Sequence, residues 1–273
     1  MSGAPGGPEP APPLPPWVAL VRAPNPGPMT LEGTNTWVLG TAGGVVVVDP
    51  GPLHEEHLRR VAAHGPVLRT VLTHGHPDHA EGARRFAALT GAPVLARDPA
   101  LALDGPALAA GPLPLDAAPG AAPPGLDVEV LLTPGHTADS VCLLVRGPDG
   151  ARALLTGDTV LGRGTTVVAH PDGRLGDYLA SLRRLAALGP LPVLPGHGPP
   201  RPDAGAAARA YLAHREQRLA EVRAALAAGA RTPAEVVAAV YPDLPAALRP
   251  AAERTVRAAL VLLGQEGLSA SGA

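Results

Sequence analysis

Residues 73–79 read Thr-His-Gly-His-Pro-Asp-His and carry more chemical information than any other stretch of this 273-residue chain. Three more short segments place a histidine or an aspartate beside glycine, and these are Pro134–Thr137, Thr156–Thr159 and Pro195–Gly198. Together the four segments supply seven candidate metal ligands: His74, His76, Asp78, His79, His136, Asp158 and His197. Imidazoles and carboxylates are the usual zinc ligands, and seven of them suffice for two ions around a shared water.

Taken singly, these residues have ordinary structural explanations. Asp78 suits the N-cap of a helix that begins near His79, and Asp158 suits an Asx turn. The joint occurrence is the stronger argument, because five of the ten histidines of the chain fall in these segments. His74 and His76 lie two residues apart on one loop, so both can face one ion while Asp78 and His79 serve a second. The remaining histidines receive no ligand role, and we expect the first two of them to share a solvated helix face: His54, His57, His64, His170 and His214.

Hydrophobic patterning predicts strands and helices that alternate over residues 17–200, which is an α/β arrangement with ligand segments after strand ends. The expected strands are 36–39, 45–48, 67–72, 128–132, 141–145, 153–155 and 193–194. The expected helices are 53–64, 80–89 and 177–188, the last with Asp177 as its N-cap. Residues 1–16 and 103–126 are rich in Pro, Gly and Ala, so we expect a disordered tail and an irregular surface segment.

Residues 201–273 show only helical patterns. Asp203 is a candidate N-cap for a long helix to about residue 228, and Thr232 opens a capping box followed by proline. Pro250 begins a further helix that ends near Gly264. Three helices with a short tail are typical of a small winged-helix-like domain that has little room for a wing. We therefore expect a catalytic domain at 17–200 and a helical domain at 201–273.

The composition argues against several classes of partner, although a local basic groove stays open. Formal net charge is −2, all 22 basic residues are arginine, and aromatic residues make up 2% of the chain. No overall field attracts nucleic acid or an anionic membrane. Cys142 is the single cysteine, so no internal disulfide forms, and its apolar neighbours predict a core thiol. The N-terminus lacks a signal-peptide pattern and no apolar run approaches membrane-span length, so we expect a cytoplasmic protein without a membrane partner.

Over about residues 17–200 the motifs resemble those of the metallo-β-lactamase fold, with Asp49 in Val-Asp-Pro-Gly as a fifth motif. The resemblance implies an αββα sandwich and two Zn²⁺ ions per chain. It implies one ion held by His74, His76 and His136 and another held by Asp78, His79 and His197. Asp158 would bridge the ions, Asp49 would support the histidine loop, and Asp78 and Asp158 would take part in catalysis.

A narrower resemblance links residues 25–36 and 157–167 to the lactamase-beta-like protein two group, which carries a C-terminal winged-helix-like domain. Its animal members are endoribonucleases that act on single-stranded RNA. The chain departs from them at Ser140, where many relatives have histidine, and at Gly75, where animal members have a bulky aromatic residue. We expect substrate contacts from residues in or near these segments: Asn35, Ser140, Arg163, Gly164, Thr165 and Thr166.

Three functions follow from these observations. The first is a dinuclear zinc phosphodiesterase that cleaves single-stranded RNA. The second is a thiolester hydrolase of the glyoxalase II type, which residues 133–137 also fit, although the chain has no lysine to hold glutathione. The third is a non-catalytic interaction or nucleic-acid-binding module, for which nine Arg against seven acidic residues in 201–273 is weak support. The amphipathic face from Leu212 to Leu226 favours internal packing over a homodimer seam.

Overall fold

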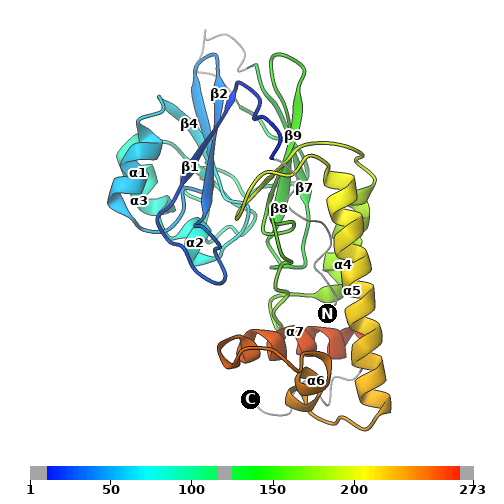
Figure 1. Ribbon diagram of the computed structural model, residues 1–273. Coiled ribbons are helices and arrows are strands. Elements are labelled where there is room, and N and C mark those ends of the chain that lie inside the picture. Colours follow the sequence, from blue (N-terminus) through cyan, green and yellow to red (C-terminus); the bar gives the residue numbers. More distant parts are fainter. Residues whose placement is uncertain (1–10, 116–124, 265–273) are drawn as a thin grey trace.

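A computed structural model describes residues 11–115 and 125–264 of the chain and shows two facing sheets with helices on both outer sides (Figure 1). The first sheet has the order β1-β2-β3-β4-β5, formed by Val18–Arg22, Asn35–Thr41, Gly44–Val48, Val67–Val71 and Val94–Leu95. The second has the order β10-β9-β8-β7-β6, formed by Val193–Pro195, Arg152–Gly157, Val141–Arg146, Asp127–Leu132 and Gly111–Pro112. The αββα sandwich expected from the sequence is confirmed.

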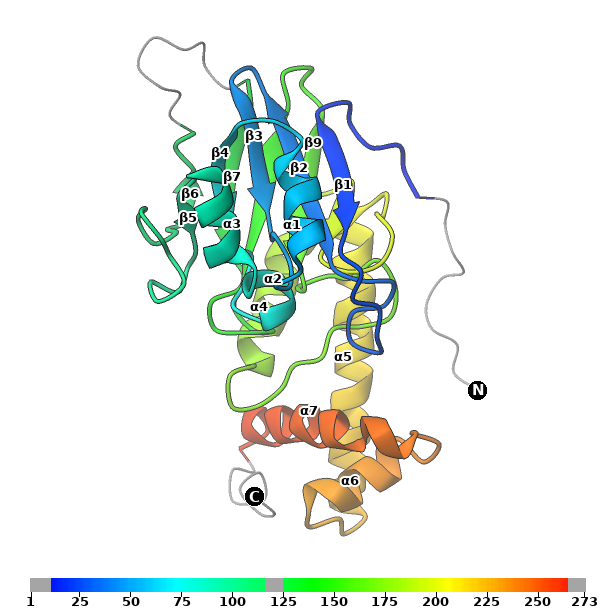
Figure 2. The same cartoon turned by 90° about the vertical axis from the view of Figure 1, so that its left-hand side faces the viewer.

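The helices divide between the two outer faces and a separate C-terminal group. Helices α1 (Glu55–Ala62) and α3 (Ala83–Thr90) cover the first sheet, and the short α2 (Pro77–Ala80) lies at its lower edge (Figure 2). Helices α4 (Leu175–Ala186) and α5 (Ala204–Ala227) cover the second sheet. The C-terminal group consists of α6 (Pro233–Val240), the 3₁₀ helix η1 (Ala246–Leu248) and α7 (Arg249–Leu262). It lies below the two sheets in Figure 1, at the C-terminal end of α5.

Alternation along the strands explains why the layers form. In β3, Val46 and Val48 face the inter-sheet core, whereas Val45 and Val47 pack with α1 and α3 on the outside. Successive side chains of a strand point to opposite faces, so one run of valines supplies both layers. Burial of each such side chain contributes roughly 1.5–3 kcal/mol. Cys142 lies in the core on the outer side of the second sheet, and burial raises its thiol pKa to about 11. The prediction of a core thiol is confirmed.

The long helix α5 joins the sandwich to the C-terminal helices (Figure 1). The Asp203 side chain accepts a hydrogen bond from the Ala206 amide at its N-terminus, as predicted. Thr232 and Glu235 form the reciprocal capping box of α6, which is also confirmed. Both α4 and α7 pack against α5, and apolar residues of all three share one core. No strand follows α6 in residues 241–264.

Two helix boundaries differ from the sequence expectation. The helix predicted over 80–89 is interrupted at Gly82, because the Gly82 amide donates to the Gly51 carbonyl oxygen at 2.9 Å instead of closing a helical turn. As a result, α2 and α3 are separate helices. The prediction of Asp177 as an N-cap is wrong, because α4 begins at Leu175 with Arg174 as its N-cap residue. Asp177 lies instead in the first turn, where a carboxylate favours the helix dipole.

The two Pro/Gly-rich segments are partly described. Residues 1–10 and 116–124 lie outside the described residues, so the expectations for them stay predictions. Residues 11–16 contain no helix or strand, and Leu14 packs partly buried against the inter-sheet core. None of the helices in the described ranges combines the length and hydropathy that a membrane span requires.

His57 is buried, which contradicts the expectation of a solvated histidine. It is 1% exposed, and its Nε2 lies 3.0 Å from the Thr36 hydroxyl on β2. His54 is exposed as expected and caps α1 by accepting a hydrogen bond from the His57 amide at 3.3 Å. Burial lowers the pKa of His57 from 6.5 to about 4.

This pKa predicts acid sensitivity of the fold. Between pH 6.5 and about 4 the unfolded chain binds a proton at His57 and the folded chain does not, so stability falls as pH falls. His57 accounts for a loss of at most about 3 kcal/mol in the free energy of unfolding over this pH range. In His57→Gln this contribution is absent, so we expect urea unfolding at pH 7, 6, 5 and 4 to show a flatter pH dependence than in the parent. A parallel decline in both proteins would contradict the prediction.

Candidate active site

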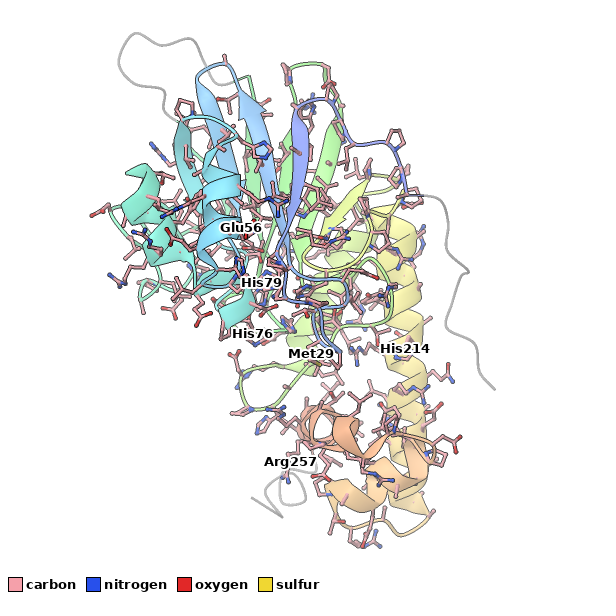
Figure 3. All side chains as sticks on the ribbon, turned by 60° about the vertical axis from the view of Figure 1, so that its left-hand side comes forward. Met29, Glu56, His76, His79, His214 and Arg257 are labelled. Atoms are coloured by element: carbon pink, nitrogen blue, oxygen red, sulfur yellow. The ribbon has the colours of Figure 1, made fainter. Side chains whose placement is uncertain are left out.

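All the predicted ligands meet at one edge of the sandwich, where five strands end. Asp49 follows β3, and His74 and His76 follow β4. The remaining ligands come from α2, from the loop after β7, from the end of β9 and from the loop after β10, and they are Asp78, His79, His136, Asp158 and His197. Figure 3 shows His76 and His79 at the end of the sheets that faces the helical domain.

The side chains form overlapping groups whose ligand atoms lie within 4.8 Å of one another. These groups are His74/His76/His136, His74/His79/Asp158 and Asp78/His79/His197. The first and third are the two triads that the sequence assigns to separate ions, and Asp158 lies between them. Its Oδ2 is 3.8 Å from His136 Nε2 and 3.4 Å from His197 Nε2, so one carboxylate reaches both triads.

Glycines allow these loops to approach so closely. A Cβ at Gly196 would lie 2.5 Å from Asp158 Oδ1 and 2.7 Å from His79 Cε1. Gly157 has a φ of 46°, and a Cβ there would lie 2.4 Å from the Thr73 hydroxyl. Any larger residue at either position would push the strand ends apart.

Contacts on the outer side of each ring decide which imidazole nitrogen faces the site. His136 Nδ1 lies 2.7 Å from the Val167 carbonyl oxygen, and His79 Nδ1 lies 2.8 Å from Asp49 Oδ2. A carbonyl or carboxylate oxygen can only accept, so Nδ1 carries the proton and Nε2 remains a free ligand atom. In metal sites, a hydrogen bond from the other ring nitrogen of a histidine commonly orients the nitrogen that binds the metal.

Asp49 extends this orientation to the histidine loop. Its Oδ1 accepts from the Thr73 amide and its Oδ2 from the Thr73 hydroxyl, both at 2.7 Å. Since that hydroxyl donates to Asp49, its oxygen accepts from His74 Nδ1 at 3.0 Å. Asp49 therefore fixes His79 directly and His74 through Thr73. Its backbone φ of 54° is unusual for a residue with a side chain, and such conformations gather at functional sites.

The electrostatics of the site favour a bound cation. Burial lowers the pKa of His74 well below its usual value, as a neutral ligand requires. Burial also lowers the pKa of His79, but the Asp158 and Asp49 carboxylates outweigh it and hold that pKa well above the usual value. Burial raises the pKa of Asp158, yet His79 and His197 outweigh it, so its carboxyl is ionised. Asp158 Oδ1 has no hydrogen-bond partner although it is buried. A buried carboxylate oxygen that has no hydrogen-bond partner and lies among imidazoles belongs to the donor set that zinc or iron binds.

Two of the expected substrate residues are enclosed by protein. Asn35 is fully buried, and its amide donates to the carbonyl oxygens of Pro195 at 3.0 Å and Gly198 at 2.8 Å. It therefore holds the loop that carries His197. Ser140 is 4% exposed, and its hydroxyl lies 2.7 Å from that of Thr137 within the His136 loop.

The other expected substrate residues belong to the segment after Asp158. Arg163 is exposed and pairs with the exposed Glu32. Gly164 is exposed, Thr165 is half-buried, and the buried Thr166 donates its hydroxyl to the Asp158 carbonyl oxygen at 2.7 Å. Thr166 thus contacts the backbone of Asp158.

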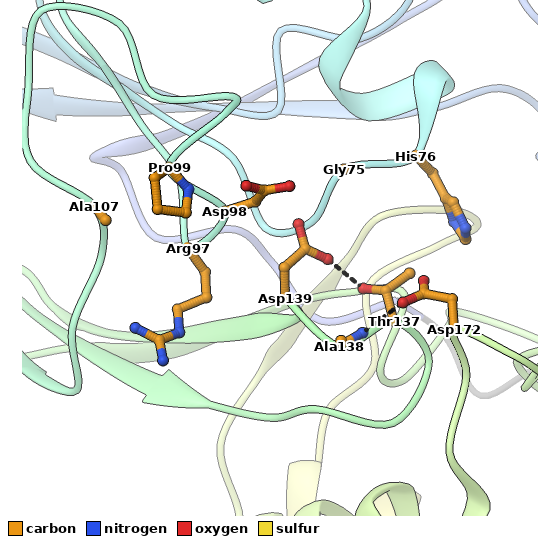
Figure 4. Close-up of a pocket in the computed structure, with 10 residues that line it drawn as sticks. All are labelled: Gly75, His76, Arg97, Asp98, Pro99, Ala107, Thr137, Ala138, Asp139 and Asp172. Atoms are coloured by element: carbon orange, nitrogen blue, oxygen red, sulfur yellow. Dashed lines mark hydrogen bonds between the residues drawn. The ribbon is translucent and has the colours of Figure 1, made fainter.

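A cavity of about 510 Å³ opens beside His76 and was not foreseen from the sequence (Figure 4). Its charged lining consists of Arg97, Asp98, Asp139 and Asp172. Asp139 accepts a hydrogen bond from the Thr137 hydroxyl at 2.6 Å. Burial raises the pKa of Asp139, and the facing Asp172 and Asp98 carboxylates raise it further. The one signal in the sequence that Asp139 would line this cavity is its position three residues after His136.

Comparison with known proteins agrees with this geometry. The family model of the metallo-beta-lactamase superfamily matches residues 29–197, and that of the beta-lactamase associated winged helix domain matches residues 232–271. An atrochrysone carboxyl ACP thioesterase from Aspergillus fumigatus is 33% identical over 259 residues, covering 85% of this chain and 76% of that protein.

Two further similarities extend over nearly the whole chain. A beta-lactamase-like protein 2 homolog from Caenorhabditis elegans is 30% identical over 270 residues, covering 92% of this chain and 85% of that protein. The crystal structure of a metallo-beta-lactamase family protein from Thermus thermophilus has a TM-score of 0.71 and 26% identity, covering 92% of this chain and 94% of that one. The chain therefore belongs to the metallo-beta-lactamase superfamily of metal-dependent hydrolases and carries the winged-helix domain associated with it.

Proposed function

We propose that the protein is a dinuclear zinc hydrolase that cleaves a thiolester or ester. The observation that carries the metal assignment is the pair of triads joined by the Asp158 carboxylate. When bound, the two ions polarise the scissile group and supply a water whose pKa is near 7. Asp49 and Val167 keep the histidine rings in the tautomers that binding requires.

The acyl substrate class is favoured by the charges around the site. The cavity beside His76 carries three carboxylates against one guanidinium, which disfavours a polyanion. Arg163, the basic residue expected to contact phosphate, is paired with Glu32. Phosphate contacts normally come from free Lys and Arg side chains. The similarity to a protein named as an ACP thioesterase supports the same class.

Cleavage of single-stranded RNA is the second candidate. It is supported by residues 25–36 and 157–167, which resemble the endoribonuclease group, and by the similarity to a beta-lactamase-like protein 2 homolog. This function ranks first on sequence motifs alone. We rank it second because the three carboxylates that line the cavity beside His76 disfavour a polyanionic substrate.

We expect the protein to hydrolyse an uncharged N-acetylcysteamine thiolester, and we expect a chelator to stop this turnover. Turnover of an anionic glutathione thiolester, a labelled unstructured RNA and a β-lactam should each be slower. In Asp139→Asn the loss of one carboxylate should raise kcat/KM for the glutathione thiolester about fivefold at low salt, since a charge pair near 4 Å in water contributes about 1 kcal/mol. The value for the uncharged thiolester should change little, which makes it the internal control.

The same assays distinguish the candidates. Chelator-sensitive RNA cleavage without thiolester turnover would establish the second candidate in place of the first. A protein that contains metal but prefers the anionic thiolester would contradict the charge argument.

A further inference from the structure

Arg215 on α5 is buried, with 5% of its surface exposed. Among the residues that the structure describes, no acidic side chain pairs with it, in contrast to Arg59, Arg85, Arg163 and Arg218. Its Nη2 donates to the Thr166 carbonyl oxygen, and its guanidinium lies over the Tyr178 ring, 5.4 Å from the centroid. A buried guanidinium without a carboxylate is uncommon, so these two contacts require an explanation.

The two partners of Arg215 hold the backbone at Asp158 and at the next residue, Thr159. The Thr166 hydroxyl donates to the Asp158 carbonyl oxygen at 2.7 Å. The Tyr178 hydroxyl donates to the Thr159 carbonyl oxygen, also at 2.7 Å. One side chain of α5 therefore supports two consecutive peptide units at the Asp158 carboxylate.

One helical turn earlier, α5 touches the same segment again. The Tyr211 hydroxyl accepts a hydrogen bond from the Leu161 amide at 3.0 Å. The other end of α5 packs with α6 and α7. The helix is thus a continuous connection between the winged-helix domain and the turn that carries Asp158.

We propose that Arg215 is a positioning residue that sets the Asp158 carboxylate between the two triads and thereby makes the metal site depend on α5. The inference rests on the proposed metal site. A guanidinium suits the task, because its planar face stacks on Tyr178 while its edge donates to a carbonyl. Residues that orient metal ligands from behind typically change metal affinity or activity by about 10–100-fold when replaced.

Arg218 provides a matched control on the same helix. It is half-buried and lies over the Tyr241 ring at 5.1 Å, as Arg215 lies over the Tyr178 ring, but it pairs with Glu221 at 2.6 Å. None of these contacts reaches residues 158–167. A general loss of packing should affect Arg215→Met and Arg218→Met alike, whereas loss of positioning should affect only the first.

The test compares Arg215→Met, Arg215→Lys and Arg218→Met with the parent. In the metal-free proteins we expect faster amide hydrogen exchange at residues 158–167 in Arg215→Met alone. We expect its zinc affinity to fall about 10–100-fold, its cobalt-substituted absorption bands to shift, and kcat to fall while KM stays within about twofold. Arg215→Lys, which keeps a donor, should recover part of each change.

Parent-like exchange, zinc affinity and cobalt spectrum in Arg215→Met would overturn the proposal. Equal losses in Arg215→Met and Arg218→Met would overturn it as well, because they would show a structural role only. If Arg215→Met does not fold, a fall in zinc affinity and a shifted cobalt spectrum in Arg215→Lys that Arg218→Met does not share support positioning. Parent-like values in Arg215→Lys, or equal losses in the two variants, refute it. A parent that binds no metal would refute the proposed function, and the exchange comparison would still decide whether Arg215 orders residues 158–167.

Discussion

Asp158→Ala should lower turnover on the order of a thousandfold while the chain stays folded, the scale seen when a group that steadies reacting charge is removed. The carboxylate lies 3.5 Å from His79 Nε2 through Oδ1 and 3.4 Å from His197 Nε2 through Oδ2. Its removal leaves each triad with its own ligands but takes away the group shared between them. We therefore expect the spacing of the two ions, and with it hydrolysis, to be lost before the fold is.

The measurement is thiolester turnover of the zinc-loaded variant, with circular dichroism and thermal unfolding recorded on the same sample. Asp177→Ala is the control, because it removes the same charged group from an exposed position in the first turn of α4. A folded Asp158→Ala protein with turnover within about tenfold of the parent would refute the bridging role.

Features that depend on neighbours in sequence were predictable. The valines of β3 alternate between two cores, and period-two alternation is a local property. The caps Asp203 and Thr232 act on amides three residues away. The seven candidate ligands were found for a related reason, since five of them stand beside glycine after a strand and Asp78 and His79 belong to the same short run as His74 and His76.

Features that depend on distant contacts were not predictable. His57 is buried because Thr36 on β2 lies beside it, 21 residues away in sequence. The break at Gly82 comes from the hydrogen bond of its amide to the Gly51 carbonyl oxygen, 31 residues away in sequence. Asn35 resembled a substrate ligand in its motif, yet its amide is taken up by carbonyls more than 150 residues away. In each case periodicity and propensity are correct locally, and tertiary packing decides the outcome.

His74→Ala and His197→Ala should each reduce bound zinc from about two ions per chain to about one. His197 belongs to the triad with Asp78 and His79, so its loss leaves His74, His76 and His136 intact. His74 belongs to the other triad, so its loss leaves Asp78, His79 and His197 intact. The intact triad keeps all its ligands, whereas the triad that has lost a histidine should bind its ion too weakly to retain it through gel filtration.

The measurement is zinc content by mass spectrometry after gel filtration, with His64→Ala as the control, because His64 is exposed and belongs to none of the ligand groups.

The contacts of His74 and His197 also predict which ion leaves first. His74 is oriented by the Thr73 hydroxyl and Asp49, whereas His197 Nδ1 has a long contact of 3.4 Å to the Gly33 carbonyl oxygen. His197 is therefore oriented less firmly than His74, and we expect a chelator to remove the ion of the His197 triad first from the parent. Unchanged zinc content in both variants would show that these triads do not bind the metals.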